Sequence, residues 1–338
     1  MRQMLTNLKP ENLDDIQAAI ALYRPGPMDS IPQYIEGRHD PDKITYAIPQ
    51  LEPILKSTCG CVVYQEQVMS IFREIAGYTF GHADIVRRAM SKKKASVLEA
   101  EREQFIAGAE ERGISQADAT KLFDDMSSFA NYAFNKSHAA AYAIISYRTA
   151  YLKAHYPKQF YAALLTSVLG NIPKVGEYII ECNKHKIPVL PPSINHSEMN
   201  FHVSGEGIRF GLLALKNVGK QFIAQILSER ARGFYESFED FLSRLGDHDL
   251  NKRQVEALIK CGAFDGLGAN RNQLLSSYEK LVDLQADKKR SNLSGQLDMF
   301  SVMPAGGEFT TSSFQYPNIP ELTLREKLLC EKESTGMS

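Results

Sequence analysis

One segment of the sequence constrains the fold more than any other. The run from Ser137 to Tyr156 is apolar or small on nearly every side. Ser137 can cap the start of a helix, and Pro157 follows directly after the run, so the pattern is typical of a long α-helix that stops before the proline. A helix that is apolar all round is expected to be buried. We therefore predict a mainly α-helical chain with this helix in its interior.

The flanking sequence adds further helices and one small β-element. Asn12 can cap a helix that ends before the rigid turn Tyr23–Pro27. Alternating apolar residues over 201–210, around a glycine-rich turn, predict a small β-hairpin. Helices resume from about residue 212 to 287. The polar stretch 288–321, rich in Ser, Gly, Pro and Thr, is expected to be extended or disordered.

Composition excludes several classes of protein. The chain has 39 basic and 40 acidic side chains, so any nucleic-acid site depends on local clusters of Lys and Arg. Five scattered cysteines without a CxxC pair encode neither a disulfide framework nor a zinc ribbon, and they argue against a thiol redox enzyme. We expect buried thiols in a reducing cytoplasm. No apolar run approaches the roughly 20 residues that a membrane span needs, so we expect no membrane association.

A cationic run is the first candidate site. The segment Arg87–Lys94 carries five positive charges and no acid, and Arg88 and Lys92 lie one helical turn apart. A triphosphate carries about four negative charges near neutral pH, and Arg and Lys are the side chains that match it. The alternative is a solvated helix face, which is the safer interpretation of an isolated basic run.

The second candidate lies directly before the long helix. Tyr132, Phe134, Asn135, Lys136 and His138 bring aromatic, amide, ammonium and imidazole groups to a helix N-terminus, where the helix dipole favours an anion. Either aromatic ring has a face on which a base can stack. The pattern fits an alternative equally well, in which Ser137 only caps the helix and the aromatic rings belong to the core.

The third candidate is a glycine turn between two predicted helical segments. Leu215–Lys220 fits the helix-hairpin-helix pattern, in which backbone N–H groups approach a DNA phosphate without reading sequence. Val218, Gly219 and Lys220 are the candidate DNA-binding residues. A weaker second copy is predicted at Gly262–Gly268. An ordinary αα-hairpin explains either turn alone, but a tandem pair makes that interpretation weaker.

A short apolar motif is the fourth candidate. Gln296, Leu297, Asp298, Met299 and Phe300 lie within the polar stretch, where no local core is expected for large apolar side chains. We therefore predict that they fill a pocket on a partner protein. The alternative is an apolar spot that docks on its own domain.

Taken together, the sequence resembles the alpha subunit of bacterial DNA polymerase III, the C-family replicative DNA polymerase. The matching motifs run in order over essentially the whole chain. They are Ala21–Pro27, Tyr64–Met69, Arg87–Lys94, Tyr132–His138 and Leu152–Pro157. The sequence departs from the family pattern at Asn131 and Ala133 and in the second glycine turn.

The resemblance implies three regions. Residues 1–195 would form the fingers domain, which contacts the incoming nucleotide and the template. Residues 196–287 would contain the β-hairpin and a tandem helix-hairpin-helix unit that binds duplex DNA. Residues 288–338 would form a flexible tail with a motif that docks on the sliding clamp, and Glu331–Glu333 would approach an oligonucleotide-binding domain outside this chain.

The resemblance also implies roles for the candidate residues. The clamp motif would be Gln296–Phe300, and Val218–Lys220 would hold primer-template DNA. The triphosphate of a deoxynucleoside triphosphate would be bound by Arg87, Arg88, Lys92, Tyr132, Asn135, Lys136 and His138. Further partners would be the other replicase subunits.

Catalysis in this family requires carboxylates of a palm domain that hold two Mg²⁺ ions. These carboxylates precede the fingers, so we expect no catalytic or metal-binding residue and no bound cofactor in this chain. Asp124–Asp125 has no third carboxylate at a suitable spacing. We expect the chain alone to incorporate no nucleotide, and both its ends to be boundaries within a longer protein. The rival hypothesis is a stand-alone DNA-binding scaffold, which leaves the cationic run and the Tyr132–His138 block unexplained.

Overall fold

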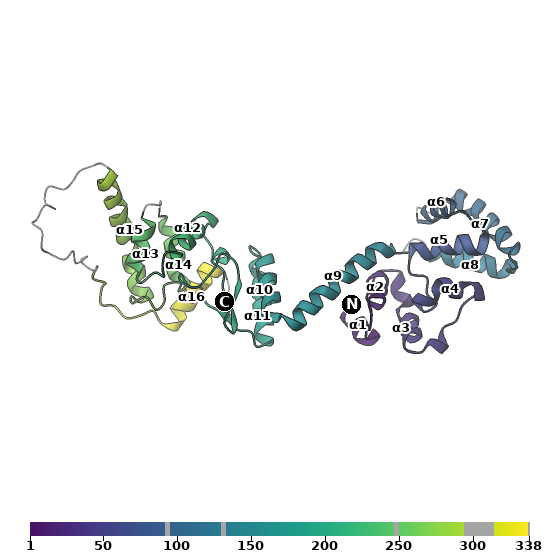
Figure 1. Cartoon of the computed structure of the whole chain (residues 1–338), viewed down its shortest axis with the longest axis horizontal. Coiled ribbons are helices and arrows are strands. Elements are labelled where there is room, and N and C mark those ends of the chain that lie inside the picture. Colours follow the sequence, from purple (N-terminus) through teal and green to yellow (C-terminus); the bar gives the residue numbers. More distant parts are fainter. Residues whose placement is uncertain (92–94, 130–132, 247–249, 294–313, 337–338) are drawn as a thin grey trace, which may run out of the picture. The chain divides into compact units, whose positions relative to one another are not determined.

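A computed structural model describes residues 1–91, 95–129, 133–246, 250–293 and 314–336. The chain divides into two compact units, Met1–Tyr151 and Leu152–Ser338. Helices dominate both units, so the predicted mainly α fold is confirmed (Figure 1).

The first unit contains α1 to α8 and most of α9. Its α-helices are α1 Arg2–Leu8, α2 Leu13–Leu22, α3 Ile31–His39, α4 Glu52–Leu55, α5 Gln65–Ala76, α6 Phe80–Ser91, α7 Ala95–Glu110, α8 Gln116–Phe129 and α9 Lys136–His155. Short 3-10 turns occupy Pro27–Ser30, Pro41–Lys43, Pro49–Leu51 and Lys56–Thr58.

The second unit combines helices with one small sheet. Its elements are α10 Pro157–Ser167, α11 Ile172–Lys184, β1 Val189–Leu190, β2 His202–Ser204, β3 Gly207–Arg209, a 3-10 turn Leu212–Ala214, α12 Lys220–Arg230, α13 Phe238–Leu245, α14 Lys252–Lys260, α15 Arg271–Leu293 and α16 Leu324–Thr335.

Two apolar clusters form the core of the first unit. One lies among α1, α2 and α3, where Leu8, Leu22 and Tyr34 are fully buried. The other lies among α4 to α8 and includes Phe72 and Phe105, whose ring centroids are 5.2 Å apart in an edge-to-face arrangement. These clusters hold the two helices that carry the predicted nucleotide-binding residues, α6 and the start of α9.

Two helix starts test the predicted caps. Asn12 caps α2 as predicted, because its Oδ1 accepts a hydrogen bond from the backbone N–H of Asp15 at 2.9 Å. The cap predicted at Ser137 is wrong, since α9 begins one residue earlier. There the Oδ1 of Asn135 accepts a hydrogen bond from the N–H of His138 at 2.9 Å. Both amide side chains take the ordinary role of an N-cap residue.

The predicted burial of α9 is also wrong over most of its length. Ala139 and Ala143 are fully buried, but Tyr142, Ile145 and Tyr147 are each about half exposed (51%, 56% and 52%). Only the alanine side of the helix faces the core. The remaining apolar side chains therefore give the helix its uniform apolar character without being buried.

One continuous apolar cluster forms the core of the second unit and joins its helices to the sheet. Strands β2 and β3 pair antiparallel, which confirms the predicted hairpin, and β1 adds in parallel to β3. Tyr161, Leu165 and Cys182 of α10 and α11 are buried in the same cluster. Residues 157–195 thus pack with the second unit, which differs from the predicted division near residue 195.

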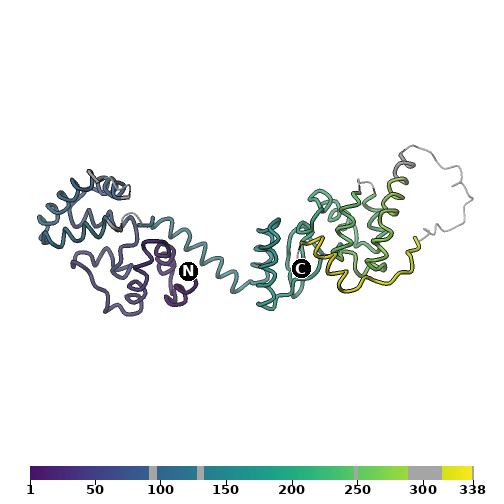
Figure 2. The backbone as a smooth tube through the Cα atoms, turned by 180° about the vertical axis from the view of Figure 1, so that it is seen from behind, coloured from purple at the N-terminus to yellow at the C-terminus, as the bar shows by residue number. Residues whose placement is uncertain are grey.

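The C-terminal segment, residues 314–336, packs on the second unit. The rings of Phe314 and Tyr316 lie against its core, and α16 packs against α14. Figure 2 shows this segment, in yellow, returning along the helices of the second unit. The segment differs in this respect from the flexible tail predicted from residue 288 onward, and α15 itself continues to Leu293.

Candidate nucleic-acid interface

The start of α9 is held in place by the start of α5. The backbone of Phe134 pairs with that of Val63 and Gln65, with N–H to O distances of 3.1 and 2.9 Å. The carboxylate of Glu66 accepts two contacts from the backbone N–H of Lys136, at 3.0 and 3.1 Å. This anchoring groups Asn135, Lys136 and His138, three of the predicted nucleotide-binding residues, at one helix end. Tyr132, the fourth predicted nucleotide-binding residue of this block, lies outside the described residues.

The first N–H groups of α9 already have acceptors within the protein. Lys136 donates to Glu66, and His138 donates to the side chain of Asn135. A phosphate that binds these two N–H groups has to displace those acceptors. The side chains, rather than the helix end itself, are therefore the groups that a triphosphate meets first. The Lys136 ammonium lies 5.6 Å from the centre of the Tyr64 ring.

Aromatic and cationic side chains form a continuous row across this helix start. The Arg24 guanidinium lies 4.2 Å from the centre of the Phe134 ring. His138 contacts Phe134 on one side and Tyr142 on the other, with ring centroids 5.4 and 4.6 Å apart. Phe134 is only 7% exposed and belongs to the core cluster among α1, α2 and α3, whereas Tyr142 is half exposed. The ring of Tyr142 is therefore the one in this row that suits stacking on a base. Arg24 and Tyr142 were not predicted, although Tyr142 lies one helical turn after His138.

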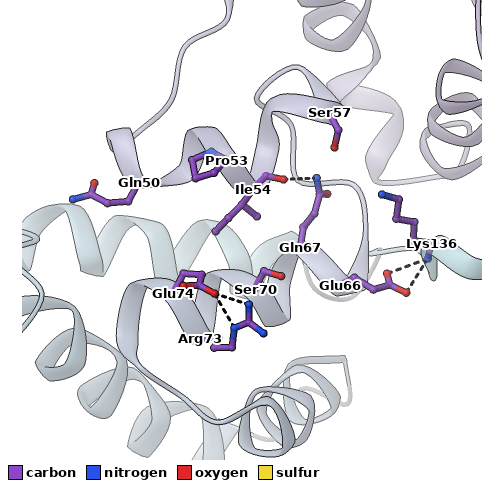
Figure 3. A pocket seen from close by; sticks show the side chains of 10 residues that line it. All are labelled: Gln50, Pro53, Ile54, Ser57, Glu66, Gln67, Ser70, Arg73, Glu74 and Lys136. Carbon is purple, nitrogen blue, oxygen red and sulfur yellow. Dashed lines mark hydrogen bonds and ion pairs between the residues drawn. The ribbon is translucent and has the colours of Figure 1, made fainter.

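A polar cleft of about 710 Å³ opens beside the same helix start. Figure 3 shows Lys136 and Glu66 on one side of this cleft, and Arg73 and Glu74 on α5, where Arg73 donates to Glu74 at 2.6 Å. Gln67 lies between them and donates to the carbonyl of Ile54 at 3.3 Å. The cleft thus offers cations, carboxylates and amides close to the predicted nucleotide-binding block.

The two predicted arginines lie on a different helix, α6. Both pair with the carboxylate of Asp84, Arg87 at 2.8 Å and Arg88 at 2.7 Å. The hydrogen bond from Arg87 holds the pKa of Asp84 below its ordinary value. Arg88 is largely exposed and is the better placed of the two to meet a ligand, whereas Arg87 is mostly buried. Lys92, the third predicted cation, lies outside the described residues.

The first hairpin has the local geometry that the pattern predicts. Asn217 adopts a left-handed conformation with φ 63°, Val218 is buried, and Lys216 and Lys220 are exposed. Asparagine is one of the few non-glycine residues that adopt this conformation readily. A 3-10 turn precedes the hairpin in place of the predicted full helix, and α12 follows it.

Gly219 is not required by the fold. Its φ of −78° suits any residue, and a Cβ atom added there meets only the side-chain Nε2 of Gln254, at 3.3 Å. No side chain caps α12, which begins directly after Gly219. The first N–H groups of α12 are therefore approachable from outside the protein, which is the arrangement that a phosphate contact needs.

The second hairpin is built differently. Gly262 has φ +79°, and a Cβ atom there runs into the guanidinium of Arg271, so internal packing requires this glycine. Arg271 is almost fully buried and forms ion pairs with Asp265 at 2.7 Å and with Glu331 of α16 at 2.8 Å. The second glycine turn thus serves the internal structure of the unit.

The C-terminal segment also covers the start of α15. Side chains in the first turn of α15 donate hydrogen bonds to its backbone carbonyls. The three pairs are Asn270–Ile319 at 3.2 Å, Asn272–Pro320 at 2.8 Å and Gln273–Pro317 at 3.1 Å. A carboxylate oxygen of Glu321 lies 3.4 Å from the backbone nitrogen of Asn272. The helix end that a second DNA contact needs is therefore occupied by the chain itself.

Comparison with known proteins agrees with these two regions. Residues 1–113 match the family model of the bacterial DNA polymerase III alpha subunit finger domain, and residues 186–274 match a model of the helix-hairpin-helix motif. The chain is 48% identical over 307 residues to the DNA polymerase III subunit alpha of Thermus aquaticus. It is 44% identical over 338 residues to that of Deinococcus radiodurans and 43% identical over 338 residues to that of Chlamydia muridarum.

The chain belongs to the family of bacterial DNA polymerase III alpha subunits. The matches cover 89%, 98% and 100% of this chain, but only 25%, 25% and 27% of the three relatives. It therefore spans about a quarter of the length of the alpha subunits that it matches. The finger model includes α6 with Arg87 and Arg88, and the helix-hairpin-helix model includes both glycine turns.

The described residues of this alpha-subunit chain contain no set of side chains that fits the Mg²⁺ ions of polymerase chemistry. No group of three or more His, Cys, Asp or Glu residues in the described ranges is arranged to hold a metal ion. Asp124 is paired with Arg102 at 2.9 Å.

Burial raises the pKa of the Cys61 thiol to about 12 and that of Cys182 to about 11, so neither is a reactive thiolate at neutral pH.

Two further observations complete the description of this alpha-subunit chain. The predicted clamp motif, Gln296–Phe300, lies outside the described residues and stays a prediction. None of the described helices is both long and apolar enough to cross a lipid bilayer.

Proposed function

We propose that the chain forms the nucleotide-binding and duplex-binding part of a replicative DNA-directed DNA polymerase in the cytoplasm. Duplex binding is supported most directly by Gly219, which the fold does not require. Gly219 lies between two exposed lysines, Lys216 and Lys220, and directly precedes α12, whose start no side chain caps. The Mg²⁺-dependent chemistry belongs to a palm domain outside these residues. The chain by itself binds nucleotide and DNA but extends no primer.

In this proposal the incoming deoxynucleoside triphosphate meets two sets of side chains. Arg88 and Lys92 of the cationic run, together with Lys136 and His138 at the start of α9, supply the positive charge and the donors. The half-exposed ring of Tyr142, next to His138, supplies a face for stacking. Contacts of the polymerase with the sliding clamp, through Gln296–Phe300, and with other replicase subunits complete the proposal.

Gly219→Ala is expected to lower the affinity of the chain for duplex DNA by roughly tenfold, because the added methyl group keeps a phosphate from the first N–H groups of α12. Affinity for short duplexes of unrelated sequence is measured by fluorescence anisotropy over a range of salt concentrations. Binding is expected to ignore sequence and to weaken steeply with salt. Gly176→Ala in α11 is the control, because its added Cβ atom meets open space and no DNA contact is predicted for this helix.

Two results bear on this proposal directly. If Gly219→Ala binds duplex as the unchanged chain does, with the same circular dichroism spectrum, the hairpin is only structural. Lys220→Ala is expected to lower the slope of log Kd against log salt by about one, since one phosphate contact is lost.

Arg88→Ala in the full-length polymerase is expected to raise KM for the nucleotide by roughly tenfold or more, because a charge-assisted contact is worth about 1.5–3 kcal/mol. Steady-state primer extension measures KM, and Arg102→Ala on α7 is the control, since Arg102 is exposed and paired with Asp124. If primer affinity falls instead and KM is unchanged, Arg88 holds DNA rather than the triphosphate.

A further inference from the structure

The start of α14 lies against the first hairpin. The side-chain Nε2 of Gln254 is the one group that a Cβ atom on Gly219 meets within 4 Å, at 3.3 Å. Gln254 is partly exposed, and its amide forms no hydrogen bond with any of the described residues. This partly exposed amide lies beside the uncapped end of α12, and no hydrogen bond to a described residue occupies its donors at the place where a phosphate is expected.

The preceding residue adds a free charge. Arg253 is exposed and has no carboxylate partner in the part of the chain that the structure describes. Its neighbour Lys252, by contrast, is tied to Asp283 of α15 at 2.7 Å. Asn251 caps α14 by accepting the N–H of Arg253 at 2.9 Å, which fixes this first turn. Of these two adjacent cations, Lys252 is held by an ion pair, so Arg253 is the one that is available to a ligand.

The second hairpin does not compete for this role. Its helix start is covered by residues 317–321 of the same chain, and its glycine turn is packed around Arg271. A second point of contact with DNA therefore has to come from another element of the unit. Gln254, in the first turn of α14, lies against Gly219 of the first hairpin.

We propose that Gln254 and Arg253 bind two neighbouring DNA phosphates, together with Gly219 and Lys220. The Gln254 amide and the N–H groups of α12 donate to the same phosphate, and Arg253 meets the next phosphate of that strand. The second hairpin is replaced in this role by the start of α14. The proposal rests on the duplex binding proposed above and names residues that neither the sequence pattern nor the comparisons assign.

An isosteric charge change tests the proposal. Gln254→Glu puts a carboxylate where the phosphate is expected, and duplex affinity should fall roughly tenfold or more. Gln273→Glu adds the same charge at the start of α15, where no DNA contact is expected, and should change affinity less than threefold or so if only distant charge repulsion acts. Thermal unfolding of both variants shows that the fold is kept. The probe is a short blunt-ended DNA duplex.

A second pair of variants tests whether Arg253 contacts a phosphate directly or only adds positive charge to this surface. Arg253→Ala should lower the slope of log Kd against log salt by about one, whereas Lys252→Ala should leave it nearly unchanged. Equal losses in each pair mean that only net charge matters, which overturns the proposal. No loss at Gln254→Glu or Arg253→Ala overturns it as well.

The outcome for Lys220→Ala and Gly219→Ala distinguishes this proposal from the proposed function. If these two variants weaken duplex binding while those at positions 253 and 254 do not, only the role of α14 is refuted. If none of the four weakens it, the proposed duplex binding fails together with the further inference.

Discussion

Arg271→Ala is expected to lower the free energy of unfolding by about 2–4 kcal/mol, because it empties a buried site and removes the hydrogen bonds that join Arg271 to Asp265 and Glu331. The Arg271 side chain is only 7% exposed and pairs with Asp265 and Glu331 at 2.7 and 2.8 Å. Its removal leaves a cavity, while the carboxylates of Asp265 and Glu331, 48% and 39% exposed, lose their partner but keep contact with water. It also frees α16, because Glu331 loses its partner. Urea denaturation followed by circular dichroism measures the change.

Arg102→Ala is the matched control for this prediction. It also removes an arginine from an ion pair, with Asp124, but that pair is exposed and is expected to contribute less than about 1 kcal/mol. Hydrogen exchange should show that α16 opens first in the Arg271 variant. A loss of stability no greater than that of the control would mean that the cluster is not what holds α16 to the second unit.

Two local patterns predicted the local structure correctly, although a third placed the cap of α9 at Ser137 in place of Asn135. The cap at Asn12 and the hairpin formed by β2 and β3 each depend on residues close together in sequence. The burial of α9 was predicted wrongly for a physical reason, since apolar composition reports burial only when a neighbour covers each face. The packing of residues 314–336 was not predicted because it depends on contacts such as Arg271–Glu331, between residues 60 positions apart.

The candidate site shows the same division. Asn135, Lys136 and His138 are consecutive or nearly so, and their grouping follows from the start of one helix. Arg24 reaches Phe134, and Gln254 reaches Gly219, only because the fold brings distant segments together. A single sequence carries no signal for such pairs. The residues that complete each site therefore came from the structure.

The predicted clamp motif, Gln296–Phe300, is a short stretch of the chain between two described segments of the second unit. α15 ends at Leu293, and beyond the motif Phe314 and Tyr316 pack on the core of the second unit. Gln296–Phe300 is thus joined to the unit on both sides. Leu297 and Phe300 are expected to fill an apolar pocket on the sliding clamp, with the Gln296 amide fixing orientation. Modest affinity is enough, because polymerase and clamp are held on the same DNA.

The double change Leu297→Ala and Phe300→Ala in the full-length polymerase is expected to abolish processive synthesis. Anchor residues of this kind contribute about 2 kcal/mol or more each, so clamp affinity should fall roughly 100-fold or more even without full additivity. Product lengths on a long primed template, with the clamp loaded, measure processivity. Extension of short primers without the clamp should be unchanged, because the motif touches neither nucleotide nor primer.

The control for this change removes one aliphatic and one aromatic side chain elsewhere. Ile180→Ala with Phe234→Ala serves, since both residues are more than half exposed on the second unit (57% and 62%). This control should keep processivity, because single exposed apolar side chains are common on protein surfaces and no clamp contact is predicted for these two. If the motif variant loses both clamp-dependent and clamp-independent extension, the segment packs on the polymerase itself, since loss of a clamp contact alone leaves short-primer extension intact.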